Sequence, residues 1–371
     1  MKLKIMIMAL LLITGIGSAV NRLPATEFVG DVEMRGSNLL NATLGGSGPY
    51  AYVGSQLWCD YITDGVDDAE QVVQAYLDGY STVVITSTIV VNGSNPIWFP
   101  NGQKRLTAPT YYPVSVILDP ATSGPMLLIN STGNEIDRVT FDGNRSEYIA
   151  DEHGILWTSG NQNNIRLCRM VNIGADAIHI DAPNTSLGGG EVSRNYIYNV
   201  YRYGLYLSGN DLMFFDNEVG WGSDISIYMS SANNNHISRN HIWCNYSSGA
   251  VDTATMRLDG YQNVVSMNDF DGITKWGIVI TAGSDYSQII GNKFWNVIYD
   301  GGYAVIIDAT QDTTTHLMIN NNMARKVSGY LYAINIDPSH NHTVVGNNFA
   351  GLVAWGTSGN TIAGNDMIIG S

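Results

Sequence analysis

The chain has few cysteines, few charged residues and no long apolar run after its N-terminal segment, and each shortage excludes a class of protein. Only three cysteines, at positions 59, 168 and 244, occur in 371 residues. So small and odd a number excludes a disulfide framework and leaves at least one thiol unpaired within a monomer. Charged residues make up 14% of the chain and apolar residues 44%, which is typical of a folded protein rather than a disordered one.

Basic residues are the scarcest of the charged types. The chain has 18 Lys and Arg against 33 Asp and Glu, a net charge of −15 and a pI near 4.6. Phosphate backbones and anionic membranes attract basic proteins and repel acidic ones. The composition therefore excludes a nucleic-acid partner.

The N-terminal segment has the order of a secretory signal. Two lysines precede an apolar stretch over 5–16, and the small residues Gly17, Ser18 and Ala19 follow. This order predicts a signal peptide over 1–19, a secreted or cell-surface protein, and no membrane span after cleavage. The alternative is an uncleaved membrane anchor, but the stretch is shorter than the ~20 residues that cross a bilayer.

A short pattern recurs along the second half of the chain: an apolar residue, two small or polar residues, an Asn, and an apolar residue two positions later. "VSRNYI" and "ISRNHI" are two copies. Successive copies lie 18 to 29 residues apart, and an imperfect period of this size is the mark of a solenoid. The aligned residues are Asn195, Asn217, Asn240, Asn268, Asn292, Asn321, Asn347 and Asn365.

A second strand-like piece, such as "AIHID" or "GLYLS", occupies a nearly fixed place in each repeat. Its alternation of apolar and variable residues is the period of a strand with one buried face. Leucine-rich repeats also carry Asn rows, but they require Leu at most inward sites, whereas these sites mix Ile, Val, Met and Leu. The sequence therefore predicts an all-β fold, a single-stranded parallel β-helix, in which Asn fits tight turns and its amides bond from coil to coil.

A helix is predicted before the first coils. Asp67 and Glu70 have the spacing of a capping box, an apolar stripe follows, and Gly79 ends the pattern. We expect a short N-terminal capping helix at about 67–78, an extended segment over 20–58 and a β-helix domain over 59–371.

The run "DGVDDAEQVVQAYLDGYSTVVI", followed by "NPIWFPNGQKRLTAP", is similar to the opening segment of secreted pectate-lyase-like, right-handed β-helix proteins. The later "G-I-x-I" and "N-x-I" repeats resemble the carbohydrate-binding and sugar-hydrolysis type of β-helix repeat. This resemblance implies a right-handed coil and a carbohydrate ligand. It implies no particular reaction, because these motifs encode coils rather than chemistry.

Function in a β-helix must lie on outward residues that align across coils, because inward positions form the core. The predicted outward column combines rings with a guanidinium, and the position two residues later supplies carboxylates. Rings beside hydrogen-bonding groups suit a sugar, although exposed Tyr is also simply a good strand residue. The predicted substrate-binding residues are His179, Asp181, Tyr206, Tyr228, Arg257 and Asp259.

The stretch "NIGADAIHID" resembles the Gly-Asp-Asp-x-Ile-x-Ile segment of polygalacturonase-type hydrolases, with Asp176 at the second Asp. It departs from that family at Ala175, which replaces the first Asp, and at Tyr203, where the family has a His. We expect Asp176 to be a surface carboxylate one coil away from a second acidic group. The candidate catalytic residues are Asp151, Glu152, His153 and Asp176.

Asp308 and Asp337 are expected on adjacent coils at one column, where two like charges favour a bound cation. Ca²⁺ is therefore compatible with these two carboxylates as a metal site, while no cofactor is required by the sequence. The coil pattern continues through 367–369, which predicts an oligomer or a head-to-tail assembly through an uncapped C-terminal coil.

Taken together, these features predict a secreted or cell-surface protein that binds extracellular polysaccharide. Cleavage is a further hypothesis, through either a polysaccharide lyase or a glycoside hydrolase mechanism. The alternative is a non-catalytic structural, adhesive or assembly-forming surface protein.

Overall fold

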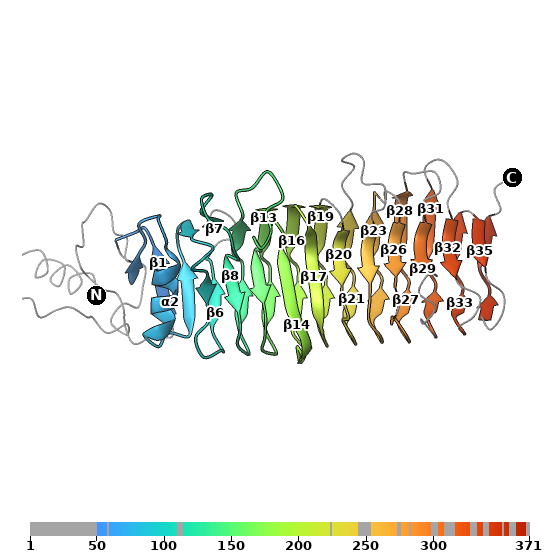
Figure 1. The fold of residues 1–371 in the computed structure, drawn as a ribbon, viewed down its shortest axis with the longest axis horizontal. Helices are drawn as coiled ribbons and strands as arrows, with labels where there is room; N and C mark the ends of the chain where they lie inside the picture. Colours follow the sequence, from blue (N-terminus) through green and yellow to red (C-terminus); the bar gives the residue numbers. More distant parts are fainter. Residues whose placement is uncertain are drawn as a thin grey trace, which may run out of the picture.

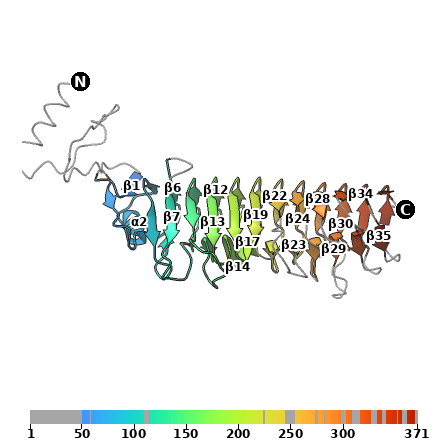
Figure 2. The ribbon, with the colours of Figure 1, turned by 90° about the horizontal axis from the view of Figure 1, so that it is seen from above.

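A computed structural model describes most of the chain from Tyr50 onward. The described residues are 50–57, 59–109, 114–222, 225–243, 254–272, 276–281, 283–297, 303–307, 316–326, 332–336, 341–350, 352–355 and 361–368. Three parallel sheets run side by side along the length of the molecule, with helix α2 (Ala69–Leu77) at one end (Figure 1; Figure 2).

The first sheet has 14 strands. In spatial order they are β2 (Tyr61–Ile62), β1 (Tyr50–Gly54), β3 (Thr82–Ile85), β6 (Arg105–Thr107), β9 (Glu135–Asp137), β12 (Asn164–Arg166), β15 (Glu191–Ser193), β18 (Met213–Phe215), β21 (His236–Ser238), β24 (Val264–Ser266), β27 (Gln288–Ile290), β30 (Met318–Asn320), β33 (Thr343–Val345) and β36 (Thr361–Ala363).

The second sheet has 12 strands and the third has 11. The 12-stranded sheet contains β4 (Ile89–Val91), β7 (Ser115–Leu118), β10 (Thr140–Asp142), β13 (Arg169–Ile173), β16 (Tyr196–Val200), β19 (Glu218–Gly222), β22 (His241–Trp243), β25 (Asp269–Asp271), β28 (Lys293–Val297), β31 (Met323–Lys326), β34 (Asn348–Ala350) and β37 (Asp366–Ile368). The 11-stranded sheet contains β5 (Ile97–Trp98), β8 (Leu127–Ile129), β11 (Ile155–Trp157), β14 (Ile178–Ser186), β17 (Tyr203–Asn210), β20 (Ile225–Met229), β23 (Ala254–Leu258), β26 (Trp276–Ile280), β29 (Tyr303–Ile307), β32 (Tyr332–Ile336) and β35 (Leu352–Trp355).

Each coil contributes one strand to each sheet in turn. The chain passes from β15 to β16 to β17 and then returns to the first sheet as β18, which pairs in parallel with β15. Residues at alternate positions point inward, so Ile178, Leu205 and Ile227 stack on neighbouring coils and are fully buried. This arrangement is a parallel β-helix with one continuous apolar core, and it confirms the predicted fold class.

Buried asparagines line the corner between the 14-stranded and 12-stranded sheets. The Asn195 amide nitrogen Nδ2 donates to Asn217 Oδ1 at 3.0 Å and to the Ile165 carbonyl at 3.0 Å. Asn217 repeats this pattern toward Asn240, also at 3.0 Å. Because each amide satisfies backbone and side-chain groups of neighbouring coils, few buried polar groups at this corner stay unpaired.

The turn itself is formed by the residue before each Asn. Arg194, Asp216 and Arg239 all have φ of 55°, in the left-handed region, while the buried asparagines do not. The buried Asn therefore supplies the coil-to-coil hydrogen bonds that were expected of it. The tight turn that was also expected of Asn is formed instead by the residue before it. The alignment at one coil was also wrong: Asn322 bonds to Asn347 in this row, and Asn321 is the left-handed turn residue with φ of 54°.

A second row of buried amides, which the repeat pattern did not reveal, lies at the corner between the 11-stranded and 14-stranded sheets. Asn134 bonds to Asn163 at 2.9 Å, and Asn235 bonds to Asn263 at 3.1 Å. Ser287 takes the same place one coil later, where its hydroxyl accepts from the Asn263 backbone N–H.

The N-terminal helix is present, but it begins later and without the expected capping box. Its N-cap is Asp68, whose carboxylate accepts from the backbone N–H groups of Asp64, Gly65 and Val90 instead of capping the helix. The carboxylate of Asp67 turns to the Asn92 backbone N–H. These bonds attach the helix start to β4, so the two aspartates anchor the cap to the first coil.

The 14-stranded sheet begins before residue 59, the expected start of the domain. β1 pairs in parallel with both β2 and β3, so residues 50–54 belong to the sheet and not to an extended segment. The division at 19 and the segment before Tyr50 lie outside the described residues and stay predictions. Within the part of the chain that the structure describes, no helix has the length and apolar character needed to span a membrane.

Candidate functional site

The predicted outward column forms one straight row on the 11-stranded sheet. His179, Tyr206, Tyr228 and Arg257 are direct partners on β14, β17, β20 and β23. The row ends beside the turn that joins β13 to β14, where Asp176 lies. The structure therefore brings four of the six predicted binding residues together with two predicted catalytic residues, Asp176 and His153.

Asp176 is completely buried, which corrects the expectation of a surface carboxylate. Arg202 Nε donates to Asp176 Oδ1 at 2.7 Å, and its Nη2 donates to Oδ2. The backbone N–H of Tyr203 adds a third bond to Oδ1 at 3.2 Å. Burial alone would raise the pKa of Asp176, but the hydrogen bonds from Arg202 and His179 outweigh it and lower that pKa. The carboxylate is thus held ionised.

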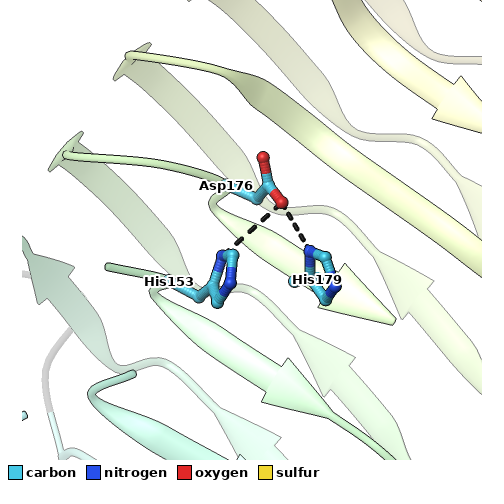
Figure 3. A group of neighbouring side chains, drawn as sticks. All are labelled: His153, Asp176 and His179. Carbon is cyan, nitrogen blue, oxygen red and sulfur yellow. Dashed lines mark hydrogen bonds and ion pairs between the residues drawn. The ribbon is translucent and has the colours of Figure 1, made fainter. Parts of the chain in front are cut away.

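His179 receives its orientation from this carboxylate. Its Nδ1 lies 2.5 Å from Asp176 Oδ2 (Figure 3). An ionised carboxylate can only accept, so Nδ1 carries the proton in this bond and Nε2 of a neutral ring keeps a lone pair. The arrangement gives His179 the tautomer of a general base.

His153 lies just before β11, on the preceding coil, and its ring centroid is 4.3 Å from that of His179. Its Nδ1 lies 3.5 Å from Asp176 Oδ2 (Figure 3) and is buried with no hydrogen-bond partner among the described residues. Burial, partly opposed by Asp176, lowers the pKa of His153 to about 4. At neutral pH the imidazole of His153 is therefore uncharged.

The rings of the row stack on one another along the solenoid. His179 and Tyr206 lie 4.3 Å apart at 6°, and Tyr206 and Tyr228 lie 5.6 Å apart at 10°. Arg257 covers the next ring face, 5.3 Å from the Tyr228 centroid. Because the faces are used in these contacts, a ligand meets ring edges and the two phenol hydroxyls, neither of which bonds to another described residue. The stacked ring faces therefore do not offer the open platform that was expected, and the row presents hydrogen-bonding groups instead.

The three consecutive residues Asp151, Glu152 and His153 do not form a common cluster. Asp151 is exposed and has a left-handed φ of 67°. Glu152 is buried and forms a two-point ion pair with Arg145, at 2.5 and 2.6 Å. Only His153 reaches Asp176, because the carboxylate of Glu152 is committed to Arg145.

Two residues of the site were missed by the sequence pattern, Arg202 and Tyr203. Arg202 neutralises Asp176, and Asp176 in turn raises the pKa of Arg202 through their hydrogen bonds. Tyr203 stacks on Tyr228 with centroids 4.9 Å apart. The available signal was the stretch "YRYG", which places a basic residue between two aromatic residues at the corner after β16.

The remaining predicted residues fall in different places. Asp181 is exposed on β14 beside Ser208, and Asp259 lies just after β23, where burial raises the pKa of its carboxyl. The proposed Ca²⁺ ligands Asp308 and Asp337 lie outside the described residues.

His153, Asp176 and His179 have the composition of a transition-metal site, with ligand atoms within 4.8 Å of one another. Two imidazoles and one carboxylate suit Zn²⁺, whereas Ca²⁺ prefers oxygen ligands. Arg202, however, already places a positive charge on both oxygens of Asp176. These residues therefore do not fit a metal ion well. They fit better an Asp176–Arg202 ion pair that orients His179.

Comparison with known proteins agrees with this fold. Residues 125–294 and 188–367 match the family described as a right-handed β-helix region. Together the two matches span 125–367, more than half of the 371 residues, so the chain belongs to the right-handed β-helix family. No curated protein matches the sequence significantly.

Several solved structures share the fold at low identity. The A-module of mannuronan C-5 epimerase AlgE6 from Azotobacter vinelandii is 14% identical, with a TM-score of 0.56, and the match covers 83% of this chain and 97% of that one. The enzymatically active domain of bacteriophage CBA120 tailspike protein 2 is 12% identical, with a TM-score of 0.66 and coverage of 85% and 52%. An alginate lyase from Paenibacillus sp. str. FPU-7 is 14% identical, with a TM-score of 0.59 and coverage of 72% and 97%.

Proposed function

We propose that the protein binds an extracellular polysaccharide along the row from His179 to Arg257 and processes it by proton abstraction at Asp176, His179 and Arg202. The observation that carries this proposal is the continuous row of hydrogen-bonding side chains that ends at a partly buried histidine oriented by Asp176. A row across several coils suits a polymer, because each coil adds a contact about 4.8 Å farther along the axis.

His179 is the general base in this scheme. Its Nε2 removes the proton from the sugar carbon next to a uronate carboxylate, and Asp176 stabilises the imidazolium that forms. In an elimination, the electron pair forms a carbon–carbon double bond while the bond to the glycosidic oxygen breaks, and that oxygen takes up a proton from water. Arg257, at the other end of the row, supplies the cation for a further carboxylate, since its guanidinium forms no ion pair with another described residue.

Hydrolysis receives less support from the same geometry. A glycoside hydrolase needs two carboxyl groups within ~5 to 10 Å, one of them able to donate a proton. Here Asp176 is held ionised by Arg202, and Glu152 is committed to Arg145. Neither carboxyl group is available as a proton donor.

The structural neighbours support a polysaccharide ligand. They include a mannuronan C-5 epimerase, an alginate lyase and an enzymatically active tailspike domain. An epimerase and a lyase share proton abstraction from a sugar carbon, which is the step assigned to His179. The signal-like segment over 1–19 supports a secreted or cell-surface location, while oligomerisation stays a prediction.

The test is incubation of the mature protein with a panel of polysaccharides in D₂O, with and without Ca²⁺. Proton abstraction followed by reprotonation from solvent predicts deuterium at the sugar carbon by NMR, whereas elimination predicts the ultraviolet absorbance of an unsaturated uronate without that deuterium. New reducing ends without either signal would indicate a hydrolase and refute the proposed step.

A matched pair of variants locates the site. His179→Gln should abolish whichever signal the wild type gives, deuterium incorporation or the unsaturated uronate, while His236→Gln, at an exposed histidine on the 14-stranded sheet, should leave that signal unchanged. If His179→Gln retains the wild-type rate, the reaction does not occur at this cluster. Binding without any reaction on the whole panel would favour the non-catalytic surface protein.

A further inference from the structure

A second groove lies at a different corner of the same coils, between the 14-stranded and 12-stranded sheets. Its volume is about 670 Å³, within the ~300 to 1,000 Å³ of small-molecule sites. The buried Asn195 and Asn217 form part of its lining. The candidate site lies at the next corner, between the 12-stranded and 11-stranded sheets, so the two are separate.

Two rows of side chains border this groove. Three left-handed turn residues form one row, and the first outward residues of β16, β19 and β22, which are direct partners, form the other. The two rows are Arg194, Asp216 and Arg239, and Tyr196, Glu218 and His241.

Charges in the groove balance. Arg239 Nε donates to Asp216 at 2.8 Å, which neutralises both groups. Arg194 and Glu218 have no side-chain hydrogen bond or ion pair with another described residue. The groove thus keeps one donor and one acceptor unused and has no excess charge, although the whole chain carries −15.

An aromatic platform adjoins the groove at His241. The rings of His241 and Trp243 are in contact, with centroids 4.4 Å apart. The Trp243 indole leans back over the preceding coil and occupies the place where a side chain at Gly220 would lie. Gly220 is therefore required on β19 so that an indole can cover this strand, and Trp243 remains only half-buried.

We propose that this groove binds a neutral saccharide, with a sugar face on Trp243 and hydroxyl groups on Arg194 and Glu218. Hydroxyl groups both donate and accept, so they match an unused guanidinium beside an unused carboxylate. An aromatic face covers the apolar face of a sugar ring. The balanced charge disfavours a polyanion, which distinguishes this groove from a uronate site. The assignment does not depend on catalysis at His179.

The experiment is calorimetric titration of the full chain with neutral hexasaccharides of glucose, mannose and galactose, in the His179→Gln background. Trp243→Ala should raise the Kd of the hexasaccharide that binds about five- to tenfold, the loss expected for one aromatic contact. Glu218→Gln, which keeps the size of the side chain, should also weaken binding. Tyr261→Ala, an exposed ring at another corner, is the matched control and should change nothing.

Three outcomes would overturn the proposal. They are no binding of any neutral hexasaccharide, a Kd that neither Trp243→Ala nor Glu218→Gln changes, or tighter binding of an acidic hexasaccharide than of every neutral one. Turnover at the candidate site is measured separately in the Trp243→Ala protein and should equal the wild-type value. Loss of the groove and loss of the proposed function can therefore be distinguished.

Discussion

Two corners of the same coils follow opposite rules. At the corner after β15, β18 and β21, every coil presents the same buried asparagine, and the amides bond from coil to coil. At the corner after β13 and β16, the chain presents Asp176 in one coil and Arg202 in the next, and these two bond to each other. At the first corner, adjacent coils need identical side chains to form the row of amide bonds, so the residue repeats for a structural reason. At the second corner, adjacent coils carry side chains of opposite charge, so the repeat is interrupted and a cluster of titratable groups forms.

The largest expected loss of stability comes from interrupting the row of buried asparagines at the corner after β15, β18 and β21. Asn217→Ala removes the acceptor for Asn195 and the donor for the Val192 carbonyl, both buried. Each orphaned group costs about 1 to 3 kcal/mol, so we expect a loss of about 4 kcal/mol in the free energy of unfolding. Urea denaturation measures it. Asn199→Gly, at the other corner, should cost about 1 kcal/mol or less, because it removes one part-buried bond. Equal losses would contradict the difference between the corners.

The second expected loss of stability comes from breaking the Asp176–Arg202 ion pair at the complementary corner, the corner after β13 and β16. Asp176→Asn leaves the Arg202 guanidinium without a buried counter-charge, and we expect a loss of about 3 kcal/mol in stability together with loss of turnover. The control is Glu135→Gln, which removes a half-exposed ion pair with Arg166 and should cost less than about 1 kcal/mol. If Asp176→Asn unfolds at the wild-type urea concentration, the pair orients His179 without stabilising the corner.

Acid should destabilise the complementary corner through His153. Its pKa is about 4 in the folded protein against 6.5 when unperturbed, so between these values the unfolded state binds a proton that the folded state does not. The stability that depends on a neutral His153 is present in full above pH 6.5 and decreases as the pH falls toward 4, by about 3 kcal/mol. Urea midpoints of the wild type and His153→Gln across this range should converge as the pH falls. Parallel curves would show that His153 does not titrate there.

The smallest effect is expected from the hydroxyl groups of the ring row. Tyr206→Phe and Tyr228→Phe keep the stacked rings and remove only the phenol oxygens, so stability should change by less than about 0.5 kcal/mol. Each should weaken polysaccharide binding a few-fold, as expected for a hydrogen bond worth about 1 kcal/mol. Titration with the polysaccharide identified in the panel measures this. Unchanged affinity in the double variant would exclude the row as the binding face.

The local sequence pattern could predict which side chains along a strand point outward. It could not predict which side chains bond to one another at the corners between the sheets. His179, Tyr206, Tyr228 and Arg257 align as the period of two requires, because one inward residue fixes the direction of its neighbours. The error at Asn321 arose in "NNN", where three identical residues hide which one is the turn residue and which one is buried. The capping box failed for a similar reason: Asp67 and Asp68 both fit the motif, and only contacts with β4 and its following turn decide between them.

The sequence by itself determined the solenoid, the order of its coils and the outward column. These features depend on two repeats that can be read from the residues alone, one of two residues along each strand and one of 18 to 29 residues from coil to coil. Only the tertiary structure decided that His153 reaches Asp176 while Glu152 turns to Arg145, and that Arg202 completes the cluster. These choices join residues from different coils at irregular turns. The side-chain direction there depends on backbone angles and on competing charges from neighbouring coils, and neither quantity is present in a local pattern.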